Sequence, residues 1–228
     1  MKHKFFSLLI LCLFSASLQA QSLSRVTSGL DLGLGYQGTD KIWAPAIMYH
    51  QDLSLKHFPW MRLGWGVRTY GIYGGASQLA PKASASAGDT LSLGKISTNG
   101  ISFLISASVS FGPVEIGANT DLIGLAFGTK RSALYTSASL DGEGAEFYNS
   151  YVKAGPSSLN ALPLLLSNNN GQSEIYARIW FNNRFGVKLG YNFGQTSYSS
   201  VEKLDNGQTR FSTDYHYPYL GLTFPLYN

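Results

Sequence analysis

Strict alternation of side-chain character between Ile101 and Phe111 constrains this chain more than any other feature. Every odd position of that stretch is apolar, and every even position except Leu104 is a serine. After Gly112 and Pro113, a second alternating run begins with Val-Glu-Ile-Gly-Ala-Asn. A period of two places one set of side chains on each face of a β-strand, so the two runs predict a hairpin over residues 99–127. Its apolar face must meet either a protein core or lipid.

The same alternation recurs along the chain and predicts eight antiparallel strands. Beside the two strands of the hairpin, the expected strands cover residues 28–36, 42–55, 61–73, 174–181, 185–194 and 211–228. Turns of about five residues or fewer alternate with long connections, above all 77–99 and 129–170. Residues 162–167, followed by a possible turn at 168–171, leave a ten-stranded alternative open. A parity change in the last strand predicts a bulge near Pro218.

Composition favours strands that alternate between lipid and a polar interior. Charged residues make up 13% of the chain, about half the share that is usual in soluble domains. Aromatic residues reach 14%, and there are 25 glycines and 14 tyrosines. A mean hydropathy of −0.02 argues against a bundle of membrane-spanning helices. Basic residues are scattered and never clustered, so no nucleic-acid partner is expected.

The N-terminus has the pattern of an export signal. Lys2 and Lys4 precede an apolar run over residues 5–14, which is too short to span a bilayer as a helix. Small residues then lead to Ala20, where we expect cleavage. This predicts a signal peptide over residues 1–20 and a mature domain over 21–228. Cys12, the only cysteine, lies in the signal peptide, so the mature chain can form neither a disulfide nor a cysteine metal site.

Nine charged residues of the expected strands lie on the polar face. His50 shares this face with Asp52, one of the nine. Both signs are present in near balance, and charges inside a small barrel must pair because an unpaired buried charge costs several kcal/mol. A soluble sandwich would instead place its charges on the solvent side. The sequence therefore predicts an all-β fold, a transmembrane antiparallel up-and-down β-barrel. Its lumen would hold an ion network of Asp31, Asp52, Arg62, Arg68, Glu115, Asp121, Glu174, Arg178 and Lys188.

The signal peptide, the alternating strands and the rhythm of short turns and long loops resemble the small outer-membrane β-barrels of Gram-negative bacteria. The abundance of glycine and tyrosine resembles barrels of the Bacteroidetes group. The resemblance implies a cell outer membrane location, contact with outer-membrane lipid or lipopolysaccharide, and insertion by the barrel-assembly machinery. It covers residues 28–228 as architecture and rests on no diagnostic motif. Such barrels often end on an aromatic residue, whereas here Tyr227 is penultimate.

A lipid-modifying enzyme is one catalytic alternative. Lipid A deacylases of this architecture use a histidine with a serine two residues on, a pattern that His50, His57 and His216 lack. Asp214 and His216 share a face near the outer rim, with Ser212 close by in sequence. These residues form the best remaining candidate site for such chemistry.

An omptin-like protease is a second catalytic alternative. It would need ten strands and paired acids at the outer rim, for which the longest loop offers Asp141, Glu143 and Glu146. Loop acids at such spacing are usually only solvated. No cluster of histidines and acids has metal-ligand spacing, so neither a metal nor a cofactor is expected.

The preferred hypothesis is a non-enzymatic barrel. It would anchor loops 77–99 and 129–170 for surface interaction with an extracellular ligand or for envelope integrity. The first alternative is a narrow channel for small molecules, apolar ones included. The apolar segment 159–166 could cap or plug its mouth or lie in the lipid interface, but we expect it to pack against the rest of its own loop. Such a channel needs an open path past Arg62, Arg68, Glu115 and Arg178, and pairing of these residues across the axis would close it. A wide pore is excluded because side chains fill an eight-stranded barrel.

Overall fold

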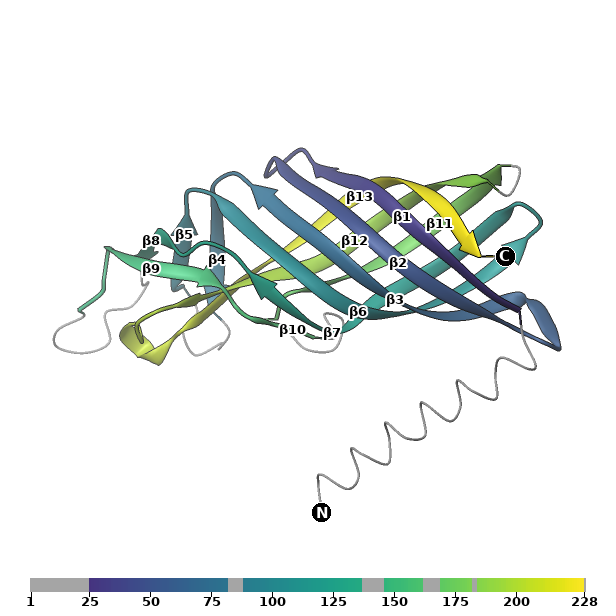
Figure 1. Ribbon diagram of the computed structural model, residues 1–228. Helices are drawn as coiled ribbons and strands as arrows, with labels where there is room; N and C mark the ends of the chain where they lie inside the picture. Colours follow the sequence, from purple (N-terminus) through teal and green to yellow (C-terminus); the bar gives the residue numbers. More distant parts are fainter. Residues whose placement is uncertain (1–24, 82–87, 137–145, 162–168, 182–183, 228) are drawn as a thin grey trace, which may run out of the picture.

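A computed structural model describes residues 25–81, 88–136, 146–161, 169–181 and 184–227. In these ranges the protein forms one antiparallel sheet of 13 strands and a 3₁₀ turn at Asp205–Gly207 (Figure 1). The expected signal peptide 1–20, Asp141, Glu143 and residues 162–166 lie outside the described residues. No helix of the described part is long and apolar enough to cross a membrane.

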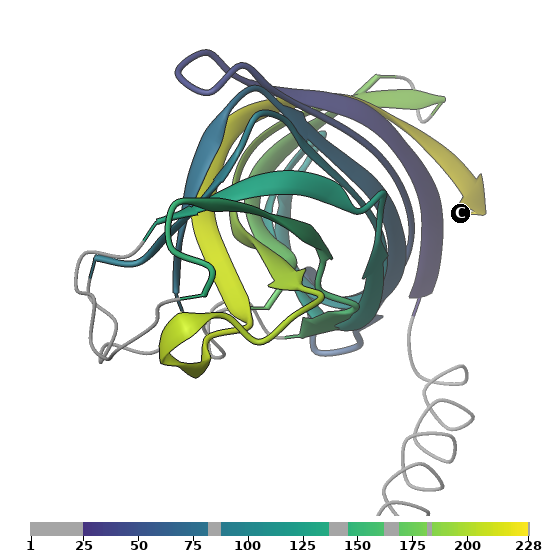
Figure 2. The same ribbon diagram turned by 90° about the vertical axis from the view of Figure 1, so that its left-hand side faces the viewer.

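Eight long strands pair in an order that returns to its start and closes a ring, called here the main ring (Figure 2). Consecutive neighbours in this ring are antiparallel, and β13 closes it by pairing with β1 from Gly35↔Tyr219 to Ser28↔Tyr227. In ring order the strands are β1 (Arg25–Gln37), β2 (Ile42–Leu55), β3 (Phe58–Gly74), β6 (Ile96–Phe111), β7 (Val114–Phe127), β11 (Gly171–Phe181), β12 (Phe185–Ser200) and β13 (Arg210–Tyr227).

Four short strands build a second, smaller ring at the end away from the turn at Gly112. They are β4 (Ser77–Pro81), β5 (Thr90–Leu93), β8 (Arg131–Thr136) and β9 (Ser150–Pro156). They pair in the order β4, β5, β8, β9, and then β9 pairs with the tip of β12 while β4 pairs with the tip of β13. Because β12 and β13 also pair with each other, these six strands close what we call the outer ring.

The expected number of strands, eight or alternatively ten, is too low. Residues 77–99 and 129–170 are not plain loops, because they contain β4, β5, β8, β9 and β10 (Leu159–Ala161), which pairs with β7. These strands are three to seven residues long. Alternation over so few residues cannot be told from the mixed pattern of a loop. The outer ring therefore went unpredicted.

The main ring has two chemically opposite faces. Its inner face is polar and buried, whereas large apolar side chains such as Leu32, Ile47 and Ile105 are exposed on its outside. The predicted hairpin is present, with a ladder that runs from Phe111↔Val114 to Asn99↔Phe127. The register shifts once within it, between Phe103 and Leu104.

Tyrosines fill much of the interior by lying against glycines of neighbouring strands. A Cβ on Gly117 would lie 2.6 Å from the ring of Tyr176, and one on Gly194 would lie 2.8 Å from the hydroxyl of Tyr215. Each tyrosine ring thus occupies the space that a side chain at the glycine would need. This packing gives a role to part of the abundant tyrosine and glycine.

The bulge expected near Pro218 is absent from the described strands. The ladder between β12 and β13 runs through Tyr191↔Pro218 without a register shift. Tyr215, Tyr217 and Tyr219 are buried inside the ring and the intervening His216 is exposed, so the parity never changes. The expected parity change is therefore wrong: the three tyrosines face inward, and Leu220 and Leu222 on the alternate positions are exposed.

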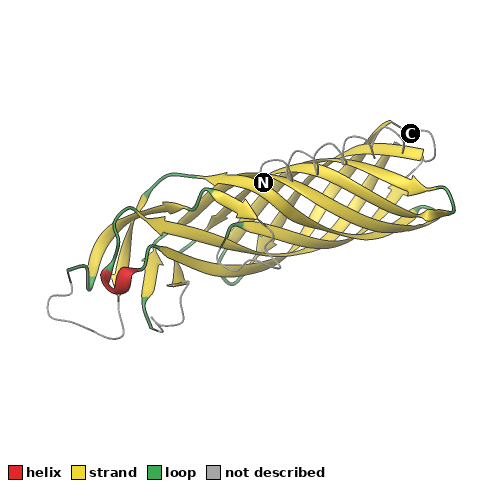
Figure 3. Ribbon diagram, turned by 90° about the horizontal axis from the view of Figure 1, so that it is seen from below, coloured by secondary structure: helices red, strands yellow, loops and turns green. Residues whose placement is uncertain are grey.

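The largest apolar core lies in the outer ring and the adjoining end of the main ring. Figure 3 shows the outer ring continuing the long axis of the main ring, with the 3₁₀ turn beside it. The core members contributed by the outer ring and its 3₁₀ turn are all buried: Leu79, Leu91, Leu93, Ala133, Tyr135, Val152, Ala154, Tyr198, Leu204 and Phe211.

Candidate functional site: an ion network inside the main ring

The main ring encloses the charged residues that the sequence places on the polar face. Each of the nine forms at least one ion pair, and all except Arg62 are buried. The side chain of Arg62 is 24% exposed. The alternation that defines the strands also brings these residues to one side of the wall, so their meeting follows from strand parity.

Arg178 of β11 lies at the centre of the network. Its Nη1 donates to Glu115 Oε1 at 2.8 Å, and its Nη2 donates to Asp31 Oδ2 at 3.0 Å. Its Nε donates to Thr223 Oγ1 at 3.2 Å. The second oxygen of Glu115 accepts from Arg62 Nη1 at 3.0 Å, so one carboxylate holds two guanidinium groups. Every nitrogen of Arg178 therefore has a partner.

Lys188 connects this group to a second set of charges toward the outer ring. Its Nζ lies 3.1 Å from Asp31 Oδ2 and 2.8 Å from Glu174 Oε2. Arg68 Nη1 lies 3.9 Å from the same oxygen of Glu174, and Arg68 Nη2 donates to Asp121. All these pairs thus form one connected network.

His50 joins the network together with Asp52, as the shared face of the two residues suggested. Its Nδ1 lies 2.7 Å from Asp52 Oδ2, and its Nε2 lies 3.4 Å from Asp31 Oδ1. Ser106 donates to the other oxygen of Asp52 at 3.2 Å. Both oxygens of Asp52 are therefore occupied within the wall, and the residue serves the network rather than a catalytic dyad.

Uncharged polar residues complete the network, whereas the sequence predicted only its charged members. Asn119 accepts from Arg68 Nη1 at 3.1 Å and donates to Glu174 at 2.7 Å. Tyr176 donates to Glu115 at 3.2 Å. Asn119 has the parity of Glu115, so a search of the polar face for amides as well as charges would have found it.

The network spans the lumen rather than lining one side of it. His50 of β2 and Arg178 of β11 come within 3.4 Å of each other, although four steps separate their strands in either direction around the main ring. Toward the outer ring, Tyr215 and Tyr217 are fully buried, and their hydroxyls donate to Gly171 O and Gln172 Oε1. Charge pairs thus cross the lumen, and buried aromatic rings lie between them and the outer ring.

The rim residues Asp214 and His216 do not form a site together. Among the described residues, each contacts a different partner. Asp214 Oδ1 accepts from Gln195 Nε2 at 2.8 Å. The ring of His216 stacks on Tyr191 with centroids 6.2 Å apart. Both side chains are exposed on the outside of the wall. Among the described residues, no group of three His, Cys, Asp or Glu could hold a metal ion.

Comparison with known proteins adds little to this description. No protein-family model and no curated protein matches the chain. Among solved structures, CdiB from Acinetobacter baumannii aligns at 9% identity over 89% of this chain and 60% of its own, with a TM-score of 0.13. A mutant of Rh. blastica porin aligns at 11% identity over 90% of this chain and all of its own, with a TM-score of 0.11. Both scores are too low to support an argument, so the interpretation rests on this molecule's own chemistry.

Proposed function

We propose that the main ring is an outer-membrane β-barrel and that it anchors the outer ring outside the cell as a non-enzymatic surface module. The observation that carries the proposal is the exposed apolar belt of the main ring. A belt of this kind, closed on itself and surrounding a charged interior, suits lipid outside and polar contacts inside.

Aromatic residues flank this belt at both ends, as they do in membrane barrels. At the short-turn end the exposed aromatic residues are Phe58, Trp60, Phe111, Phe181 and Phe185. Toward the outer ring they are Tyr36, Trp43, Tyr73 and Phe127. Aromatic rings favour the interface between lipid and water because they join an apolar body to a polar or polarisable edge.

The height of the belt fits a bilayer. On β3, Trp60 and Tyr73 mark its two ends. At about 3.3 Å per residue and a tilt of about 40°, the 13 steps between them rise roughly 33 Å. The hydrocarbon core of a bilayer is about 30 Å thick.

The arrangement favours an anchor over the two alternatives. A channel would need an open path past Arg62, Arg68, Glu115 and Arg178, but each of these residues pairs with charges from another strand. Lipid-modifying catalysis would need a converging site at the rim, where Asp214 and His216 instead contact other residues. The outer ring, in place of the loops that the sequence suggested, would then carry the surface role.

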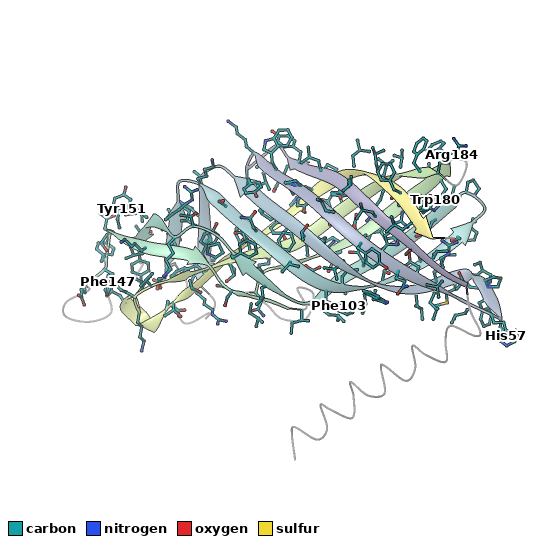
Figure 4. All side chains as sticks on the ribbon, in the orientation of Figure 1. His57, Phe103, Phe147, Tyr151, Trp180 and Arg184 are labelled. Carbon is teal, nitrogen blue, oxygen red and sulfur yellow. The ribbon has the colours of Figure 1, made fainter. Side chains whose placement is uncertain are left out.

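Single-cysteine labelling on intact cells tests the location and the orientation together. Tyr151→Cys places a thiol on the outer ring at a side chain that is 75% exposed, and Arg184→Cys places one on the opposite, short-turn rim (Figure 4). Cys12 would leave with the signal peptide, so each variant would carry one thiol. We expect a membrane-impermeant maleimide to label Tyr151→Cys on intact cells, but Arg184→Cys only after the outer membrane is opened.

A gel assay separates failure of folding from failure of the proposal. Both variants should migrate differently on unboiled and boiled gels, as closed barrels do. Equal labelling of the two variants on intact cells would contradict the orientation. A wild-type protein that dissolves without detergent and shows no gel shift would refute the membrane assignment.

A further inference from the structure

A cavity of about 430 Å³ lies at the short-turn end of the main ring, on the far side of the ion network from the outer ring. Side chains of the network form part of its wall, together with Trp180 of β11 and Ser28 of β1. Its volume lies within the range of roughly 300–1,000 Å³ that is usual for small-molecule sites. Arg62 lines it and is partly exposed, so the cavity communicates with solvent.

Asp52 lines the cavity and Glu115 holds two of its lining arginines, and each carboxylate already accepts hydrogen bonds on both oxygens. Glu115 accepts from Arg178 and Tyr176 on one oxygen and from Arg62 on the other. Asp52 has His50 on one oxygen and Ser106 on the other. A ligand that brings only hydrogen-bond donors would therefore share these carboxylates with the donors that they already hold.

Some polar groups at and near the cavity, in contrast, have no partner, and each of them can donate a hydrogen bond. The Nε of Arg62 and the hydroxyl of Ser28 are buried and have no hydrogen-bond partner among the described residues. The same is true of the hydroxyls of Ser108 and Ser110 on β6, of which Ser108 is the cross-strand neighbour of Arg62. A buried polar group without a partner costs about 1–3 kcal/mol, so a bound group that accepts hydrogen bonds would be stabilising.

The wall of the cavity also suits an anion with an organic body. Arg62 and Arg178 share the single carboxylate of Glu115. A guanidinium group presents several N–H donors in a plane, which matches the paired oxygens of a carboxylate or phosphate. Trp180 adds an aromatic surface, which Arg178 approaches at 5.4 Å from the ring centre.

We propose that this cavity binds a small oxyanion, the carboxylate or phosphate group of a soluble compound, through Arg62 and the hydroxyl of Ser28. The compound enters from the short-turn end. That this end faces the periplasm rests on the proposed function, whereas the binding itself does not.

Calorimetric titration of the full mature chain, folded in detergent, tests the site with two probes, inorganic phosphate and citrate. We expect at least one probe to bind with a Kd below about 1 mM. Arg62→Gln should weaken this binding by about tenfold or more, because it removes a charged donor. Ser28→Ala should weaken it by roughly two- to tenfold, because it removes one neutral hydrogen bond. The probe that binds with the lower Kd shows whether the site prefers a phosphate or a carboxylate.

Arg184→Gln is the matched control, because it removes an exposed arginine from the same rim without touching the cavity. Its affinity should equal that of the wild type. Absence of binding of both probes up to about 10 mM, in a protein that still shows the barrel gel shift, would refute the inference and leave the proposed function standing. Binding that is equal in all three variants would also refute it, since the site would then lie elsewhere.

Discussion

The main ring and the outer ring belong to one sheet but bury opposite kinds of side chain. In the main ring, Arg178 and Lys188 are fully buried and Ile105 is exposed. In the outer ring, Leu91 is fully buried and Lys153 is exposed. The same backbone pattern can therefore bury either polar or apolar side chains, because alternate residues of a strand point to opposite faces. Strand geometry alone does not determine which face of a strand is buried. The distribution of charged residues along the strand determines it.

The largest test of the comparison removes the central cation of the main ring. Arg178→Met would leave Asp31 and Glu115 buried with part of their charge unpaired, and should lower the free energy of unfolding by about 3–5 kcal/mol. Urea unfolding of the detergent-folded protein, followed by tryptophan fluorescence, measures the loss. Arg184→Met, at the exposed rim, should change stability by less than about 0.5 kcal/mol. Equal effects of the two substitutions would mean that the network does not stabilise the ring.

A second test removes apolar volume from the outer ring. Leu91→Ala should cost about 2–5 kcal/mol because the side chain is fully buried in the core. The loss should be local: amide hydrogen exchange should rise in β4, β5 and β8, while the gel shift of the main ring persists. Tyr151→Ala, at an exposed position, should leave exchange unchanged. Loss of the gel shift in Leu91→Ala would show that the two rings are not separable in stability.

A third test places the same charge on the outside of each ring. Ile105→Arg, halfway along β6, should destabilise the protein in lipid vesicles by about 2–4 kcal/mol, because it exposes a guanidinium group to hydrocarbon. Ser132→Arg, at an exposed position of β8, should change stability by less than about 0.5 kcal/mol. Similar values for the two variants would contradict the proposed placement of the main ring in a bilayer.

Much of the main ring could be predicted because its strands are long. Period-two alternation is clear over a stretch such as Ile101–Phe111, and it fixes which residues share a face. This is why the sequence placed Arg178 and Asp31 in one interior. It could not say that they touch, because they lie 147 residues apart and parity gives a face, not a partner.

The outer ring could not be predicted for the opposite reason. Strands such as Thr90–Leu93 hold too few residues to show a period, and they occur in a stretch rich in Ala, Ser and Gly. Their apolar residues become a core only when β4, β5, β8 and β9 meet the tips of β12 and β13. That meeting is a tertiary event with no local sequence signal. The interior tyrosines were similarly hidden, because their glycine partners lie on other strands.

The hairpin of β12 and β13 is part of both rings, and this has a consequence for the order of assembly. Neither ring can close until this hairpin has arrived, since it supplies two neighbouring strands to each. Without this hairpin, β1 and β11 have unpaired edges, and Asp31 lacks its ion pair with Lys188. Unpaired edges are sites of misassociation. Closure of the two rings is thus coupled through one shared hairpin, and each ring depends on it to remove its open edges.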